Sequence, residues 1–272
     1  MRPLEPILGF INPVAFHLGP ISVRWYGLTF VTGILAAIFM TEKAARHRGL
    51  DENFITDLAM IVVPSGILGA RLYEVFILQW PYYRQNPGEI LAIWHGGLAI
   101  HGGVIGALLC GGLYVWYKRQ SFWLWADMIG PGLILAQAIG RWGNFFNQEA
   151  YGSPAPVWLI DKMPGWLRDG MFIDGQVMHP TFLYESVWNL LCFGILYALQ
   201  RRKPRPGTVF SLYFILYNIG RFAIESIRED SSFVFGHFRV AQLMALAQIV
   251  AGLLLLVYHY RRAPQKAAGT EG

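Results

Sequence analysis

Residues 240–257 read Val-Ala-Gln-Leu-Met-Ala-Leu-Ala-Gln-Ile-Val-Ala-Gly-Leu-Leu-Leu-Leu-Val and contain no charged side chain. An apolar run of about 20 residues is long enough for an α-helix to cross a bilayer. The rest of the chain shares this character, because 54% of its 272 residues are hydrophobic and only 14% are charged. Soluble domains carry about 25% charged residues. The sequence therefore predicts a polytopic membrane protein.

Working outward from this run, we find further segments of similar length and polarity. We expect an all-α fold in which about seven transmembrane helices form one integral membrane domain over residues 1–272. The predicted spans lie near 21–42, 54–78, 89–117, 121–142, 181–200, 206–226 and 239–260. The third is rich in glycine and can bend or re-enter the membrane, since irregular backbone is tolerated where it lines an enclosed cavity. The connection 143–180 is rich in proline and is predicted to form a small periplasmic cap.

The lysines and arginines between the spans indicate the orientation of the chain. One side of the predicted topology collects Lys43, Arg46, Arg48, Lys118, Arg119, Arg201, Arg202, Lys203, Arg205, Arg261, Arg262 and Lys266. The loops on the other side carry Arg2, Arg84, Lys162, Arg168 and Arg228. The positive-inside rule then puts the N-terminus in the periplasm and the C-terminus in the cytoplasm. The same layout explains the net charge of +5 as a topology signal, so we expect no nucleic-acid partner.

The cysteines and histidines do not form a metal-binding pattern. Cys110 and Cys192 both lie in apolar runs, where they are interpreted as small buried hydrophobic residues. His95 and His101 are six residues apart, which does not put them on one helical face, and the chain has no His-Glu-x-x-His motif. We expect neither a metal nor a cofactor.

Five arginines lie inside the predicted spans or at their ends: Arg24, Arg71, Arg141, Arg221 and Arg239. At a rise of about 1.5 Å per residue, they share one depth band of roughly 10 Å toward the outer side. Guanidinium groups gathered at one level suit the oxygens of a phosphate. Arg24 and Arg239 can instead snorkel to the lipid headgroups. Arg71 can pair with Glu74, three residues later.

Arg141 and Arg221 are the strongest candidates for an anion-binding site. Each follows a glycine and precedes a carboxylate, which is Glu149 in one case and Glu225 in the other. Arg141 belongs to a tract at 140–152 that also holds two asparagines and a tyrosine. Because charges at membrane depth are costly, they usually mark a working site.

His101 lies within the third predicted span and is flanked by glycines. A buried histidine is often a hydrogen-bonded core group, and this interpretation stays open. The functional alternative is a general base, since an ordinary histidine pKa near 6.5 suits proton removal at neutral pH. His95 shares the glycine-rich setting and is a weaker candidate.

The tract Gly-Arg-Trp-Gly-Asn-Phe-Phe-Asn-Gln-Glu-Ala-Tyr-Gly at 140–152 closely resembles the signature of the prolipoprotein diacylglyceryl transferase family. Other blocks similar to this family are Arg24-Trp25-Tyr26-Gly27, Gly69-Ala70-Arg71, the glycine-flanked His101, His179-Pro180-Thr181-Phe182-Leu183-Tyr184-Glu185 and Gly220-Arg221-Phe222-Ala223-Ile224-Glu225. These blocks extend from the first predicted span to the sixth, so the resemblance covers most of the chain. It implies a helical body of seven spans with a small periplasmic head.

The resemblance also implies a reaction and its partners. Enzymes of this family transfer the diacylglyceryl group of phosphatidylglycerol to the lipobox cysteine thiol of a prolipoprotein, in the inner membrane of bacteria. The products are a thioether and glycerol 1-phosphate, and this is the first step of lipoprotein maturation. The implied partners are phosphatidylglycerol, the surrounding membrane lipid and prolipoprotein signal peptides that carry a lipobox cysteine.

Roles for individual residues follow from the same resemblance. Arg141 and Arg221 would stabilise the departing phosphate, and His101 would be the base that deprotonates the thiol. Asn144, Asn147 and Glu149 would orient the headgroup glycerol, and Tyr26 would bond a phosphate oxygen. The residues assigned to phosphatidylglycerol binding are Arg141, Arg221, Tyr26, Asn144, Asn147, Glu149, Gly152 and Glu225.

Three other classes of protein compete with a transferase. A transporter of organic anions would explain the arginines, but it predicts duplicated halves, and the sequence has no convincing duplication. An intramembrane protease would need a metal or serine motif, which the sequence lacks. A non-catalytic lipid-binding scaffold would account for the arginines but not for His101.

Overall fold

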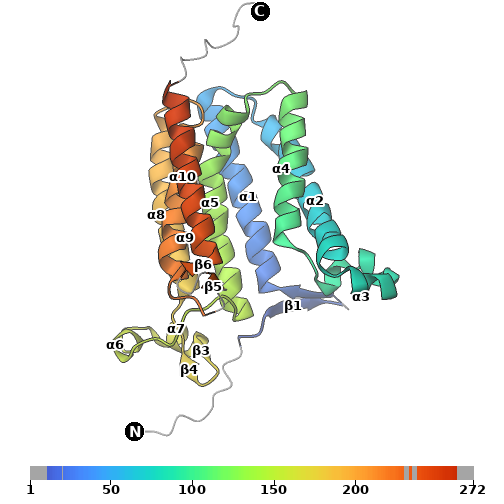
Figure 1. Ribbon diagram of the computed structural model, residues 1–272, viewed down its shortest axis with the longest axis vertical. Coiled ribbons are helices and arrows are strands. Elements are labelled where there is room, and N and C mark those ends of the chain that lie inside the picture. Colours follow the sequence, from blue (N-terminus) through green and yellow to red (C-terminus); the bar gives the residue numbers. More distant parts are fainter. Residues whose placement is uncertain (1–10, 20, 230–232, 235–237, 262–272) are drawn as a thin grey trace, which may run out of the picture. The chain divides into compact units, whose positions relative to one another are not determined.

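The computed structural model describes residues 11–261 apart from 20, 230–232 and 235–237, and long α-helices dominate it (Figure 1). Within the described residues, six helices are long and apolar enough to cross a membrane: α1 (Trp25–Arg48), α2 continued by η1 (Asn53–Leu78), α4 (Ile100–Tyr117), α5 (Phe122–Asn147), α8 (Thr181–Arg201) and α10 (Val240–Arg261). Many of their large apolar side chains, such as Leu35 and Phe39, are exposed, as expected for surfaces that face lipid. The prediction of an all-α polytopic membrane protein is confirmed.

The chain divides into two compact units, each of which is described by itself. The large unit comprises residues 1–40 and 126–272, and the small unit comprises residues 41–125. Helix α1 begins in the large unit and ends in the small one, whereas α5 begins in the small unit and ends in the large one.

Helix α9 (Thr208–Glu225) is the remaining long helix of the large unit, and it packs against both α8 and α10. It carries Asn218, Arg221 and Glu225, which lower its hydropathy, and it is not among the six apolar helices. The total of seven spans therefore stays a prediction. A buried aspartate fixes the start of α9, because the Asp127 carboxylate accepts hydrogen bonds from the backbone N–H groups of Gly207 (2.9 Å) and Phe210 (2.8 Å).

Short strands and helices cluster around the helix ends of the large unit. Antiparallel strands β1 (Val14–Leu18) and β2 (Ile21–Arg24) precede α1, and β5 (Phe233–Val234) and β6 (Phe238–Arg239) precede α10. The connection between α5 and α8 holds α6 (Val157–Ile160), α7 (Gly165–Gly170), β3 (Phe172–Ile173) and β4 (Gln176–Val177). Its buried core includes Met163, Leu167, Met171 and Met178, which pack on the ends of α5 and α8.

The small unit is built on two helices whose backbones approach closely. Helix α2 (Asn53–Tyr73) runs into the π-helical turn η1 (Glu74–Leu78), and α3 (Trp80–Gln85), η2 (Pro87–Leu91) and η3 (Ile93–His95) lead to α4. A Cβ at Gly69 would stand 2.4 Å from the Gly102 carbonyl oxygen, and one at Gly106 would stand 2.4 Å from that of Ser65. Small residues at such a crossing are typical of helix pairs in membranes.

Several predicted span boundaries were wrong, for local reasons. The third span, predicted over 89–117, is helical in α form only from Ile100, because Gly96 (φ +94°) and Gly97 (φ +73°) adopt positive φ values that interrupt the helix. The first span begins at Trp25, since residues 21–24 pair with β1. The fourth extends to Asn147, so the first residues assigned to the cap are helical.

The basic loop residues lie at one end of the large unit. Arg201 ends α8, and Arg202 and Lys203 follow it before α9. Arg205 donates a hydrogen bond to the carbonyl of Tyr260 (3.1 Å) near the end of α10. The predicted topology signals Arg2, Arg262 and Lys266 lie outside the described residues.

Candidate functional site

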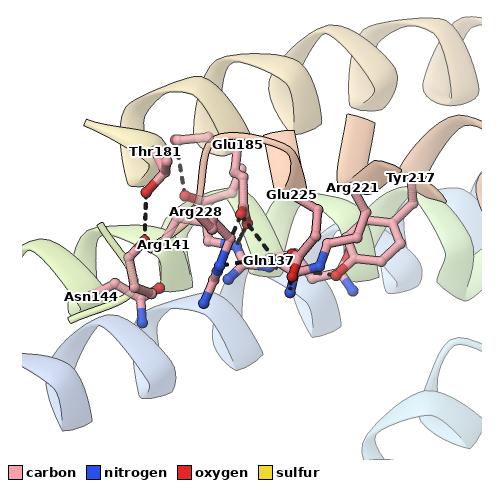
Figure 2. A network of polar contacts seen from close by, with 12 residues as sticks. Gln137, Arg141, Asn144, Thr181, Glu185, Tyr217, Arg221, Glu225 and Arg228 are labelled. Atoms are coloured by element: carbon pink, nitrogen blue, oxygen red, sulfur yellow. Dashed lines mark hydrogen bonds and ion pairs between the residues drawn. The ribbon is translucent and has the colours of Figure 1, made fainter. Parts of the chain in front are cut away.

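Charged side chains from three helices of the large unit and from the turn after one of them meet at the end of α9 that is remote from the basic loop (Figure 2). We call this set the arginine–glutamate network, and its members are Arg141 on α5, Glu185 on α8, Arg221 and Glu225 on α9, and Arg228 in the turn that follows α9. A spacing of four residues puts Arg221 and Glu225 on one face of α9, and the turn that follows brings Arg228 back beside Glu225.

Glu185 is the centre of the network. Its Oε2 contacts Arg141 Nε, and its Oε1 lies 3.1 Å from Arg221 Nη1 and 3.6 Å from Arg228 Nη1. Glu225 Oε2 pairs with Arg221 Nη2 at 2.8 Å and lies 3.8 Å from Arg228 Nε. One carboxylate thus joins guanidinium groups from α5, from α9 and from the turn after α9.

The network is sheltered but still reachable. The side chains of Glu185 and Glu225 are 6% and 3% exposed, whereas those of Arg141 and Arg221 are 20% and 21% exposed. Among its five members, guanidinium groups outnumber carboxylates by one, and arginine stays protonated in proteins. The site therefore has an excess of positive charge, and its arginines are more exposed than its carboxylates. This arrangement suits an anion that approaches the exposed parts of Arg141 and Arg221.

Neighbouring polar groups hold the network in place. Arg141 Nη2 donates to the Tyr217 hydroxyl at 3.4 Å, and Tyr217 stacks on Tyr213 with ring centroids 6.0 Å apart. Arg239 Nη1 donates to the backbone carbonyls of Glu225 and Arg228. The interpretation of Arg239 as a snorkelling residue was therefore wrong, because its guanidinium binds the end of α9.

The tract after Arg141 continues along the same helix and then turns back. Asn144 Nδ2 donates to Glu149 Oε1 at 3.0 Å, so these two predicted site residues lie together. Asn147 is half-buried, and its Oδ1 is buried with no hydrogen-bond partner among the described residues. A small cavity beside this tract is lined by Asn144, Gln148, Glu149, Tyr151, Thr181 and four apolar residues.

Gly152 links the tract to the network through its backbone. It forms an isolated bridge with Arg228, and its N–H donates to the His179 carbonyl at 3.0 Å. A Cβ at this position would stand 2.7 Å from His179 Cβ and 2.9 Å from the Ile227 carbonyl oxygen. Only glycine allows this close approach. Burial lowers the pKa of His179, whose Nδ1 lies 3.1 Å from the Tyr184 hydroxyl.

Tyr26 packs beside the same helix. A Cβ at Gly143 would stand 2.7 Å from the Tyr26 ring, and Trp25 stacks on Phe146 at 5.1 Å. The start of α1 therefore fits against the last turns of α5, and the Tyr26 side chain stays exposed.

In the small unit, Arg71 has a different role from the one predicted. It donates to the carbonyls of Ile90 (3.0 Å), Gly96 (2.6 Å), Gly97 (2.7 Å), Ala92 (3.3 Å) and Glu89. The five N–H groups of a guanidinium are thereby engaged with backbone. The predicted pairing with Glu74 was wrong, because the two 3₁₀ turns offer carbonyl groups that surround Arg71.

His101 lies at the first turn of α4 and is exposed, and its ring is 6.0 Å from that of Tyr73. It makes no hydrogen bond within the part of the chain that the structure describes, so a hydrogen-bonded core histidine does not describe it. His95 is also exposed and pairs with Glu89 at 2.8 Å. The role of His101 as a base stays a prediction.

Sequence reasoning missed three members of this site, namely Glu185, Arg228 and Tyr217. Glu185 had a signal, because it is a carboxylate inside an apolar span, and such residues are functional candidates. Arg228 was predicted as a loop residue and does lie outside α9, but the turn after the helix returns its side chain to Glu225. Tyr217 had no distinguishing signal among 13 tyrosines.

Comparison with known proteins identifies the family of the chain. A family model described as prolipoprotein diacylglyceryl transferase matches residues 13–258. The chain belongs to this family. The resemblance drawn from the 140–152 tract is thereby confirmed, and the relatives carry the name of an enzyme.

Relatives across most of the chain carry one name. A phosphatidylglycerol–prolipoprotein diacylglyceryl transferase of Symbiobacterium thermophilum is 59% identical over 98% of this chain and 99% of its own length. Proteins of the same name from Lysinibacillus sphaericus (46% identical, 97% of each chain) and Staphylococcus aureus MRSA252 (44% identical, 93% of this chain and 90% of its own) are also similar. Membership in the prolipoprotein diacylglyceryl transferase family thus covers both units.

Proposed function

We propose that this chain transfers the diacylglyceryl group of phosphatidylglycerol to the lipobox cysteine thiol of a prolipoprotein, with the arginine–glutamate network binding the lipid phosphate. Family membership and the names of the relatives support the donor and the acceptor class. The observation that carries the role of the network is its excess of guanidinium groups at a sheltered site. Phosphate oxygens match the fork of N–H groups that an arginine presents.

The reaction breaks one C–O bond and forms one C–S bond. The thiolate sulfur attacks the phosphate-bearing carbon of the diacylglyceryl group, and the electron pair of the broken C–O bond stays on the phosphate oxygen. The phosphate is a diester with one negative charge in phosphatidylglycerol. It becomes a monoester in the departing glycerol 1-phosphate and then carries more negative charge. Arg141 and Arg221 stabilise this developing charge, and such electrostatic assistance is often the largest catalytic contribution.

The acceptor thiol must lose its proton before it attacks. A cysteine thiol has a pKa near 8.5, so a base raises the fraction of thiolate at neutral pH. His101 is the base in this proposal, on the strength of the family resemblance and of its exposed imidazole. The nucleophile comes from the substrate, in keeping with the burial of Cys192.

Other residues would bind the glycerol headgroup. Asn144 and Glu149 form a hydrogen-bonded pair that can receive hydroxyl groups, and the Asn147 carbonyl can accept one. Tyr26 would donate to a phosphate oxygen. Glu225 orients Arg221, and the backbone at Gly152 ties this tract to Arg228.

We place this multi-pass protein in the bacterial inner membrane with the network toward the periplasm. Helix α9 separates the network from the basic loop at 201–205, and its length is about 27 Å at the usual helical rise. Basic loops favour the cytoplasmic side. This orientation brings the network to the leaflet where a secreted prolipoprotein emerges.

Purified protein tests the proposal directly. It is incubated with phosphatidylglycerol and a lipobox peptide, and mass spectrometry follows the peptide while a phosphate assay follows glycerol 1-phosphate. We expect a peptide heavier by one diacylglyceryl group and one glycerol 1-phosphate for each modified peptide. A peptide with serine in place of the cysteine is the control. Failure of the cysteine peptide to react, with lipid bound, would exclude the transferase.

A further inference from the structure

The feature that the reaction above does not yet explain is Glu185. An anion-binding site gains affinity from arginine, yet this carboxylate occupies the space between three guanidinium groups. Its side chain is 6% exposed, so water screens its charge poorly. A buried carboxylate in contact with arginines satisfies the same N–H groups that a phosphate would use.

The contacts divide the two carboxylates of the network into different roles. Glu225 is four residues from Arg221 on α9 and pairs with it at 2.8 Å, so it holds an arginine of its own helix. Glu185 comes from α8 and reaches across to arginines of α5, of α9 and of the following turn (Figure 2). Glu185 is therefore the group that fixes the spacing between Arg141 and Arg221.

We propose that Glu185 is a positioning residue that acts as an internal competitor for the lipid phosphate. It aligns Arg141, Arg221 and Arg228 before lipid binds, and it keeps their affinity for phosphate low enough for glycerol 1-phosphate to leave. This inference rests on the proposed function, because it assumes that the network binds the phosphate of the donor.

The physical reason is that tight binding by itself does not accelerate a reaction. An interaction of equal strength in substrate, transition state and product lowers KM and delays release of the product. A resident carboxylate weakens binding of all three, and the doubly charged product would otherwise be held most strongly. Its second effect is to hold the guanidinium forks in the geometry that the transition state needs.

Glu185→Gln separates these effects from a purely structural role. The amide keeps the shape of the side chain and one acceptor oxygen but removes the negative charge. We expect glycerol 1-phosphate to bind about tenfold more tightly, since a hydrogen bond to a charged group is worth roughly that factor. We also expect KM for phosphatidylglycerol to fall and kcat to fall by at least about tenfold, as tighter product binding and misaligned arginines predict.

The experiment measures binding of glycerol 1-phosphate by calorimetry, steady-state kinetics and the thermal unfolding midpoint of wild type, Glu185→Gln and Glu185→Asp in detergent. Glu185→Asp keeps the charge but shortens the reach, so we expect a smaller gain in affinity. Asp169→Asn, an exposed carboxylate of α7 outside the network and outside the headgroup residues, is the matched control and should leave this affinity within about twofold, because it alters only a surface ion pair with Arg168.

The outcomes are distinct. Tighter binding with a lower kcat supports the proposal, and equal or weaker binding by both Glu185 variants overturns it. Loss of the folded state in both variants would also overturn it, since Glu185 would then be a structural residue only. If wild type itself bound no glycerol 1-phosphate and no phosphatidylglycerol, the proposed function of the network would fail instead.

Discussion

Arg221 Nη1 lies 3.1 Å from Glu185 Oε1, and this ion pair joins α9 to α8 at the level where both helices carry their buried charge. An ion pair at this depth is expensive unless it has a further use, since desolvation opposes the attraction. The partial exposure of the Arg221 side chain, 21%, leaves part of its guanidinium accessible to a ligand. This ion pair explains how the Glu185 carboxylate can both hold the arginines in position and lower their affinity for phosphate.

The first prediction concerns the arginine forks. Arg141→Lys and Arg221→Lys keep the positive charge but lose the planar fork, so we expect transfer to fall by about 10²–10³-fold. Arg168→Gln, at an exposed side chain of α7, is the control and should stay close to wild type. Initial rates with phosphatidylglycerol and lipobox peptide measure the effect. Turnover near the wild-type rate in either lysine variant would contradict a bidentate contact with phosphate.

The second prediction concerns His101. His101→Asn should lose most of the transfer activity at pH 7, with partial recovery at higher pH, where more of the substrate thiol ionises without a base. His47→Asn, another exposed histidine of the small unit, should behave as wild type. The measurement is the rate of transfer between pH 6.5 and 9. A variant with no loss, or one that stays inactive at every pH, would remove His101 from the role of base.

The third prediction concerns the contact between α8 and α9. A Cβ at Gly220 would stand 2.1 Å from the Trp188 ring, whose Nε1 donates to the Leu216 carbonyl at 2.9 Å. Gly220→Ala should therefore destabilise the protein by about 1–3 kcal/mol through overpacking. At Gly194 on α8 nothing lies within 4 Å of an added Cβ, so Gly194→Ala serves as the control. The midpoints of thermal unfolding of the two variants are compared in detergent. Equal midpoints would contradict the prediction, because α8 and α9 would then accommodate the added methyl group without loss of stability.

The fourth prediction concerns the pH dependence of the protein's stability. Because burial lowers the pKa of His179 below its ordinary value, the unfolded chain binds more protons than the folded one as pH falls below about 6.5. Stability should therefore rise with pH through this range and fall on acidification from pH 7.5 to 5.5. His179→Gln should reduce this dependence, whereas His17→Gln, at an exposed strand, should not. An unchanged pH dependence in His179→Gln would show that other groups cause it.

The sequence was sufficient for the membrane class, the family and the two central arginines. Runs such as 240–257 have no charge and require a helix in lipid, and the 140–152 tract is long and specific. The contacts of Arg71 could not be predicted from the sequence, because backbone carbonyls carry no sequence signal. The turns that present these carbonyls depend on Gly96 and Gly97.

The prediction of the site residues was incomplete for a related reason. Glu185 was read as part of a family block, and its contact with arginines of other helices depends on how α5, α8 and α9 pack. Arg239 resembled a headgroup arginine by its position before an apolar run, yet it binds carbonyls at the end of α9. Pairing between distant segments needs coordinates, whereas helical spacing within one segment does not.

We propose that arginines at the periplasmic face hold a lipid phosphate while a thiol displaces it. The most direct test of this proposal is to determine on which side of the membrane the network lies. In a variant with Cys110 and Cys192 replaced by alanine, cysteine is placed at exposed Ser226, next to Glu225, or at exposed Arg202 in the basic loop. An impermeant maleimide is added to intact spheroplasts. We expect labelling at Ser226→Cys and none at Arg202→Cys until the cells are lysed. Labelling of Arg202→Cys alone would put the network at the cytoplasmic face and contradict the mechanism.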